Sequence, residues 1–233
     1  MEPLADLYKN RNNLLGINIF FHGESTLEEG PPLEPEEWKR LLMALFQKLE
    51  IGKVHLVGFS MGCKFGFLTT ELLPERISSA TFLAPDGIIK NPLYRFATQS
   101  VFGRLTLLAS VRWIPFFRML TIFFGKTGLM RASLGRFAKH EMGTKEKRNR
   151  VLNVWLRFRK IWPDWAALPG ILAKHHIRVR IITGKFDTII SPGRFEPRRP
   201  EWAGFEWIIL DSGHAGMIGK AAEKVNLDDI GSG

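Results

Sequence analysis

The chain has 233 residues, 45% of them hydrophobic, which is enough for one buried core and a small appendage. Its formal net charge is +10, but nothing in it resembles a nucleic-acid-binding motif, so nucleic acid is not an expected partner. The sequence shows no signal peptide and no uncharged apolar run as long as the roughly 18 residues of a membrane-spanning helix. Its one cysteine, Cys63, cannot form an internal disulfide, and a cytoplasmic protein is therefore expected.

Helical and strand patterns alternate along most of the chain. The predicted strands are Leu14 to Phe21, Lys53 to Val57, Ser79 to Leu83, Ile177 to Thr183 and Phe205 to Leu210. The predicted helices outside the central segment are Pro3 to Arg11, Pro35 to Glu50, Lys64 to Leu73 and Met217 to Asn226. This order predicts an α/β fold, a mostly parallel sheet with helices on both faces, in which ligands bind at the carboxyl ends of the strands.

The segment Gly58-Phe59-Ser60-Met61-Gly62 joins a predicted strand to a predicted helix. Small residues two before and two after Ser60 allow a sharp turn that exposes the Ser60 hydroxyl. The same turn points the backbone N–H of Met61 at a developing oxyanion. The alternative is a purely structural role, in which Ser60 only caps the helix at a strand-to-helix turn.

The central segment, Lys90 to Lys160, differs in composition from the rest of the chain. It carries a net charge of +14, whereas the remainder carries −4. Apolar residues recur in it at helical spacing, in two stripes: Trp113, Phe117, Leu120, Phe124, and Val151, Trp155, Phe158, Trp162. Amphipathic basic helices of this kind are usually packed on a core with a solvated charged face, and the alternative is attraction to an anionic membrane.

An acid and a base follow the last two predicted strands. Gly184-Lys185-Phe186-Asp187 places the Asp187 carboxylate just beyond one strand, and Asp211-Ser212-Gly213-His214 presents His214 after the next. The order Ser, Asp, His is the order of the α/β hydrolases.

From about Leu14 onward the chain resembles the α/β-hydrolase fold family, on the strength of the Ser60 elbow, the Asp187 loop and the His214 loop. The resemblance implies a catalytic triad of Ser60, Asp187 and His214. It also implies two core segments, residues 1–89 and 171–233, around an inserted helical cap at residues 90–170. Some relatives place the acid after an earlier strand, so Asp86 is the alternative acid.

The pair His22-Gly23 is the point at which the resemblance is incomplete. His-Gly after a strand is the family's signature for the second oxyanion donor, which would make Gly23 that donor, but only one helix separates this pair from Ser60. On the alternative alignment, the two opening strands and the oxyanion strand have no counterpart. This predicts a fragment or a shortened or rearranged fold, in which Leu14 to Phe21 either pairs with the elbow strand or leaves an open sheet edge.

The expected function is that of a serine hydrolase acting on a carboxylic ester or thioester of a small acyl substrate, without cofactor or metal. The alternatives are hydrolysis of a carbon–carbon bond in a dienoate-type acid and a weakly active or non-catalytic capped domain that binds an anionic membrane surface or a partner. Phe59 and His22 are candidate substrate-binding residues.

Overall fold

The computed structural model describes residues 13–28, 30–89, 92–113, 144–195 and 204–224, with residues 3, 5, 6, 115 and 119 described singly. The chain forms two compact units. The first comprises residues 1–17, 34–89 and 161–233, and the second comprises residues 18–33 and 90–160. The predicted helix Pro3 to Arg11 and the predicted end of the last helix at Asn226 fall largely or wholly outside the described residues, as do Phe117, Leu120 and Phe124.

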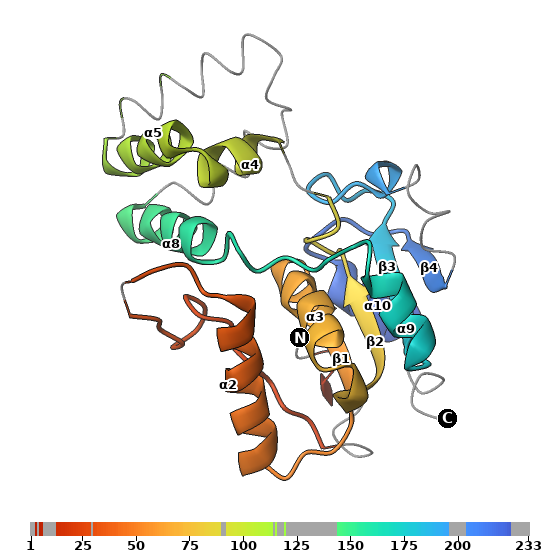
Figure 1. Ribbon diagram of the computed structural model, residues 1–233. Helices are drawn as coiled ribbons and strands as arrows, with labels where there is room; N and C mark the ends of the chain where they lie inside the picture. Colours follow the sequence, from red (N-terminus) through yellow and green to blue (C-terminus); the bar gives the residue numbers. More distant parts are fainter. Residues whose placement is uncertain are drawn as a thin grey trace. The chain divides into compact units, whose positions relative to one another are not determined.

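The first unit is built on a four-stranded parallel sheet (Figure 1). Its strands are β1 (Val54–Phe59), β2 (Ile77–Leu83), β3 (Arg178–Gly184) and β4 (Phe205–Leu210), and they lie side by side in chain order. Parallel neighbours require crossover connections, and all four carboxyl ends therefore meet at one edge of the sheet. The predicted parallel α/β sheet is confirmed.

Helices cover both faces of this sheet. α3 (Met61–Leu72) and α9 (Leu168–Lys174) contribute Phe67 and Leu172 to a core with Phe82 and Ile181 of the strands. α10 (Met217–Lys224) packs on the opposite face, where Met217 contacts Leu83, Ile182 and Leu210 in a second apolar cluster. Two short 3-10 turns, η1 (Pro74–Arg76) and η2 (Pro192–Arg194), complete the connections.

A long helix at the amino-terminal side, α2 (Pro35–Lys48), is anchored to α3 by one tryptophan. The Trp38 indole N–H donates a 2.9 Å hydrogen bond to the Thr69 hydroxyl, and its ring meets Phe65 edge-on with 4.9 Å between centroids. The hydrogen bond satisfies a buried indole donor that would otherwise be costly to remove from water.

The second unit contains three described helices, α4 (Pro92–Gln99), α5 (Val101–Arg112) and α8 (Lys145–Arg157). The Tyr94 ring lies 5.3 Å from that of Trp155, and buried Arg148 donates to the carbonyl of Val111 at 3.2 Å. The predicted stripe from Val151 to Trp162 is too long, because α8 ends at Arg157 and Trp162 belongs to the first unit.

The predicted strand Leu14 to Phe21 is wrong. Residues 13–19 form no strand, and the chain then folds into tight turns in which Phe21 and Gly23 have φ of 68° and 57°. The N–H of His22 bonds the carbonyl of Ile19, and the N–H of Phe21 bonds that of Ser25. An apolar run becomes a strand only when another strand accepts its backbone hydrogen bonds, and no described strand does so here.

β1 is consequently an edge strand of the described sheet. Among the described residues it pairs with β2 alone, and Val57 in its middle is 38% exposed. No helix in the described part of the chain is long and apolar enough to cross a membrane.

A half-buried histidine on β1 makes stability depend on pH. His55 Nδ1 lies 2.7 Å from the Ser79 hydroxyl, while its Nε2 is enclosed without a hydrogen-bond partner. Burial, aided by the charge of Arg180, lowers the pKa of His55 to about 4. The folded chain therefore resists protonation of His55 over a range in which the unfolded chain accepts the proton.

We expect the free energy of unfolding to fall as the pH drops from about 6.5 to about 4, by roughly 1–2 kcal/mol from this group once its partial exposure is allowed for. His55→Gln should flatten that part of the curve, measured by urea unfolding at stepped pH. His176→Asn, at an exposed position with positive φ where Asn is tolerated, is the control. Equal pH dependence of wild type and His55→Gln would contradict this account.

Candidate active site

Ser60 lies in a strained turn between β1 and α3. Its φ of 51° is rare for a residue with a Cβ, and its side chain makes no capping hydrogen bond to α3. The helix-capping alternative for Ser60 is therefore wrong. Gly58 explains how the turn closes, since a Cβ there would lie 2.9 Å from the Cα of Cys63.

His214 and Asp187 complete a hydrogen-bonded chain with Ser60. His214 Nε2 lies 3.1 Å from the Ser60 hydroxyl oxygen, and its Nδ1 lies 2.7 Å from Oδ2 of Asp187. The Asp187 side chain is fully buried, and its other oxygen accepts hydrogen bonds of 2.8 Å from the N–H groups of Ile189 and Ile190. One carboxylate oxygen is thus held by backbone N–H groups, while the other faces the imidazole of His214.

A glycine at the end of β3 brings the acid and the base together. A Cβ at Gly184 would lie 2.4 Å from the carbonyl oxygen of Ser212, so only glycine allows this approach. Two backbone bonds then tie the two loops, from Lys185 N–H to the carbonyl of Leu210 and from Phe186 N–H to that of Ser212. This contact explains why the Asp187 loop begins with glycine.

The rival acid, Asp86, is held near the elbow by its backbone and not by its carboxylate. Its N–H donates to the carbonyl of Ser60 at 3.1 Å, whereas the imidazole of His214 is bonded to Asp187. Burial and then the Asp86 charge raise the pKa of the Cys63 thiol, which donates to the carbonyl of Leu83. Cys63 is therefore a packed thiol unsuited to nucleophilic chemistry.

The predicted oxyanion and substrate residues are placed as follows. Met61 is the first residue of α3, where backbone N–H groups have no partner within the helix. The Phe59 ring lies 5.1 Å from the imidazole of His214, between ring centroids. His22 and Gly23 belong to the second unit, and their roles stay predictions.

The sequence did not single out a buried cation on the helix that starts at the elbow. Lys64 is 3% exposed, and its ammonium lies 5.1 Å above the ring centroid of Trp162. A lysine side chain is rarely buried unless its ammonium has a partner. The face of an aromatic ring can be that partner, because it attracts cations. No pattern in the sequence marks this lysine; in the structure it lies against Gly87, where a Cβ would meet the Lys64 Cα at 2.9 Å.

The described residues contain no group of three or more His, Cys, Asp or Glu side chains that could hold a metal ion.

Part of the chain matches the model of a known family. Residues 4–117 match the family model described as alpha/beta hydrolase fold. A thermophilic esterase from Thermogutta terrifontis superposes with a TM-score of 0.59 at 18% identity, over 96% of this chain and 80% of that one. The chain therefore has the α/β-hydrolase fold.

Other α/β hydrolases share the fold at low sequence identity. An enol-lactonase from Burkholderia xenovorans has a TM-score of 0.60 at 17% identity, over 95% of this chain and 81% of that one. A meta-cleavage product hydrolase from Pseudomonas fluorescens has a TM-score of 0.58 at 13% identity, over 95% and 80%.

One curated relative is similar over a shorter stretch. The dihydrolipoyllysine-residue acetyltransferase component of the acetoin cleaving system of Pseudomonas putida is 31% identical over 77 residues. That stretch is 32% of this chain and 20% of the acetyltransferase component, so this similarity covers a minor part of both chains.

The two candidate acids can be ranked by matched amide substitutions. Asp187→Asn should keep the fold but lower ester turnover by about four orders of magnitude, because an amide cannot stabilise the imidazolium and favours the wrong tautomer. Asp86→Asn should change turnover less than tenfold, since its carboxylate does not contact His214. Steady-state kinetics of both variants, with unfolding curves as controls, test the ranking, and the reverse order would move the acid to the loop after β2.

Proposed function

We propose that this α/β hydrolase is a serine hydrolase that cleaves a carboxylic ester or thioester through an acyl-enzyme. The observation that carries the proposal is the unbroken chain of hydrogen bonds from Ser60 through His214 to buried Asp187. We propose further that residues 90–170 are the helical cap and that the protein works in the cytoplasm, as the single buried thiol favours.

The geometry supports a role for each of the three side chains. His214 Nε2, at 3.1 Å, takes the proton of the Ser60 hydroxyl as its oxygen attacks the acyl carbonyl, and then gives that proton to the leaving group. Asp187 accepts the Nδ1 proton, orients the ring and stabilises the imidazolium that forms. Water then attacks the acyl-enzyme, with His214 again as the base, and restores the Ser60 hydroxyl.

The oxyanion that forms on the carbonyl needs donors that are already in place. We propose the N–H of Met61 as the first, because it opens α3 directly after Ser60 and lies at the positive end of the helix dipole. For the second donor, the resemblance of the sequence to the family offers Gly23 as a candidate. A single missing donor costs about 100- to 1,000-fold in turnover, so a half-built site would give a slow enzyme and still leave detectable hydrolysis.

The second candidate reaction is hydrolysis of a carbon–carbon bond in a dienoate-type acid. The fold is similar to that of a meta-cleavage product hydrolase, which supports this second reaction as a candidate. The same three side chains would catalyse it. The two reactions separate in a direct comparison of a p-nitrophenyl ester with a ring-cleavage dienoate at equal enzyme concentration. Preference for the dienoate by more than tenfold in kcat/KM would replace the esterase proposal.

The reactivity of Ser60 separates an enzyme from a binding domain. A fluorophosphonate probe should label the wild type on Ser60, fail to label Ser60→Ala, and label His214→Ala at least a hundredfold more slowly, because the base is gone. The measurement is in-gel labelling followed by peptide mapping. Cys63→Ser, which changes a buried thiol beside the turn, should keep the label, and a folded wild type that stays unlabelled would remove the proposal.

A further inference from the structure

The corner between α4 and α5 exposes a group of large apolar side chains. Phe96, Val101, Phe102 and Leu105 are 47%, 67%, 72% and 59% exposed. The two phenylalanine rings lie 6.3 Å apart between centroids. We call these four residues the apolar corner. Removing such side chains from water is favourable, so a group of them on one surface favours contact with an apolar phase or partner.

The apolar corner is held in a fixed shape by its own backbone. The Ser100 hydroxyl donates to the carbonyl of Phe96 at 3.0 Å and accepts from the N–H of Gly103 at 2.8 Å. A Cβ at Gly103 would lie 2.0 Å from that same Phe96 carbonyl, so glycine is needed for the two helices to meet this closely. Arg104 also donates to the carbonyl of Gln99 and closes the end of α4.

The apolar corner is not the interior face of these helices. The residues that pack within the second unit are a different set, among them Ala97, Leu107 and Val111, which are 7%, 9% and 4% exposed. α5 therefore carries apolar side chains on a buried side and on an exposed side. Packing within the unit explains why the buried side chains are apolar. It does not explain why the four residues of the apolar corner are apolar.

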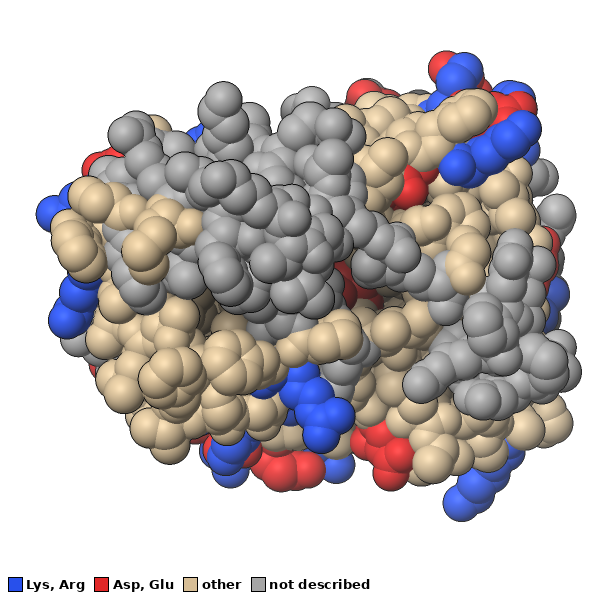
Figure 2. Space-filling view, turned by 90° about the horizontal axis from the view of Figure 1, so that it is seen from above, with Lys and Arg blue, Asp and Glu red and all other residues tan. Residues whose placement is uncertain are grey.

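The charge around the apolar corner has one sign. α4 and α5 contain Arg95, Arg104 and Arg112 and no acidic residue, and the segment from residue 90 to 160 carries +14. The space-filling view shows both basic and acidic side chains of the described residues, so the single sign of charge is a property of α4 and α5 and not of the whole surface (Figure 2). An apolar, basic surface fits a negatively charged apolar phase.

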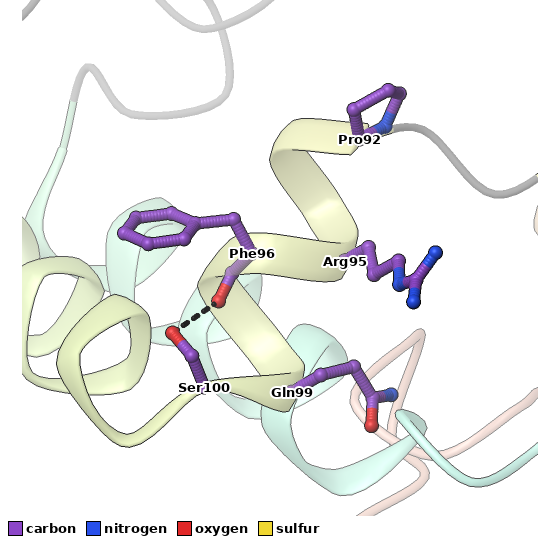
Figure 3. A pocket seen from close by; sticks show the side chains of 5 residues that line it. All are labelled: Pro92, Arg95, Phe96, Gln99 and Ser100. Carbon is purple, nitrogen blue, oxygen red and sulfur yellow. Dashed lines mark hydrogen bonds between the residues drawn. The ribbon is translucent and has the colours of Figure 1, made fainter.

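A pocket of about 390 Å³ beside the corner is lined by Pro92, Arg95, Phe96, Gln99 and Ser100 (Figure 3). All five residues come from one helix and its junction with the next, and Phe96 and Arg95 leave that helix in different directions. An interfacial helix likewise carries aromatic side chains on one face and basic side chains on another.

From these observations we infer that the apolar corner inserts into the headgroup region of an anionic lipid membrane. Phe96, Val101, Phe102 and Leu105 enter the boundary of the acyl chains, while Arg95 and Arg112 pair with anionic headgroups. The attraction of each cation to such a surface falls as the salt concentration rises, whereas insertion of the apolar side chains is insensitive to salt.

The test is sedimentation of the full chain with vesicles of phosphatidylcholine alone or with 30% phosphatidylserine, at roughly 0.1 M and 0.5 M salt. The wild type should bind the anionic vesicles at low salt, lose at least fivefold in affinity at high salt, and bind neutral vesicles weakly. Val101→Ser/Phe102→Ser should lose ten- to a hundredfold on anionic vesicles. Arg95→Gln/Arg112→Gln should lose several-fold and have a smaller salt dependence.

The matched control is Leu41→Ser/Met43→Ser, which removes two comparably exposed apolar side chains from α2 and should bind as the wild type does. Circular dichroism checks that each variant is folded, and sedimentation needs no enzymatic activity. The inference is overturned by absent binding to anionic vesicles, by equal salt-insensitive binding to both vesicle types, or by unchanged binding of Val101→Ser/Phe102→Ser. A change of molar mass in that variant without vesicle binding would assign the corner to a second copy of the chain.

Discussion

The contact between the end of β3 and the loop after β4 is the constraint on which the site depends. A glycine at position 184 lets the backbone approach Ser212 more closely than any side chain would allow, and two backbone hydrogen bonds hold the loops there. Asp187 and His214 are carried on these loops, and the parallel sheet brings the elbow with Ser60 to the same edge. Each of these three side chains is thus carried by a backbone segment that is already in place before any ligand binds.

The strain at Ser60 is offset by the packing beneath it. A left-handed backbone at a serine costs of order 1–3 kcal/mol, and it persists only where the surroundings fix it. Here the Ser60 N–H bonds the carbonyl of Leu83, and its own carbonyl accepts from Cys63 and Asp86. Cys63, whose N–H makes one of these bonds, is fully buried. Asp86, a rival acid on sequence grounds, therefore contributes to the turn through its backbone.

The features that the sequence predicted well are those set by residues close together in the chain. The elbow, the strand ends and the Gly184 to Asp187 loop each depend on a few adjacent residues, and the parallel sheet follows from the alternation of strands and helices. The strand predicted at Leu14 to Phe21 failed because a strand requires a partner, which an apolar run cannot reveal. Trp162 was assigned to a helix by spacing, although α8 ends five residues earlier at Arg157 and Trp162 instead covers buried Lys64. The substrate is set by how apolar side chains pack around the site, which no local pattern encodes.

The central claim is that Ser60 forms a covalent acyl-enzyme. Rapid mixing of the wild type with p-nitrophenyl acetate, acid quenching and mass spectrometry of the intact chain and its peptides measure this directly. The account predicts a transient adduct of one acetyl group on the peptide that contains Ser60, formed with the burst of p-nitrophenol. Hydrolysis of the ester with no adduct on Ser60, or with the acetyl group on another residue, would contradict it.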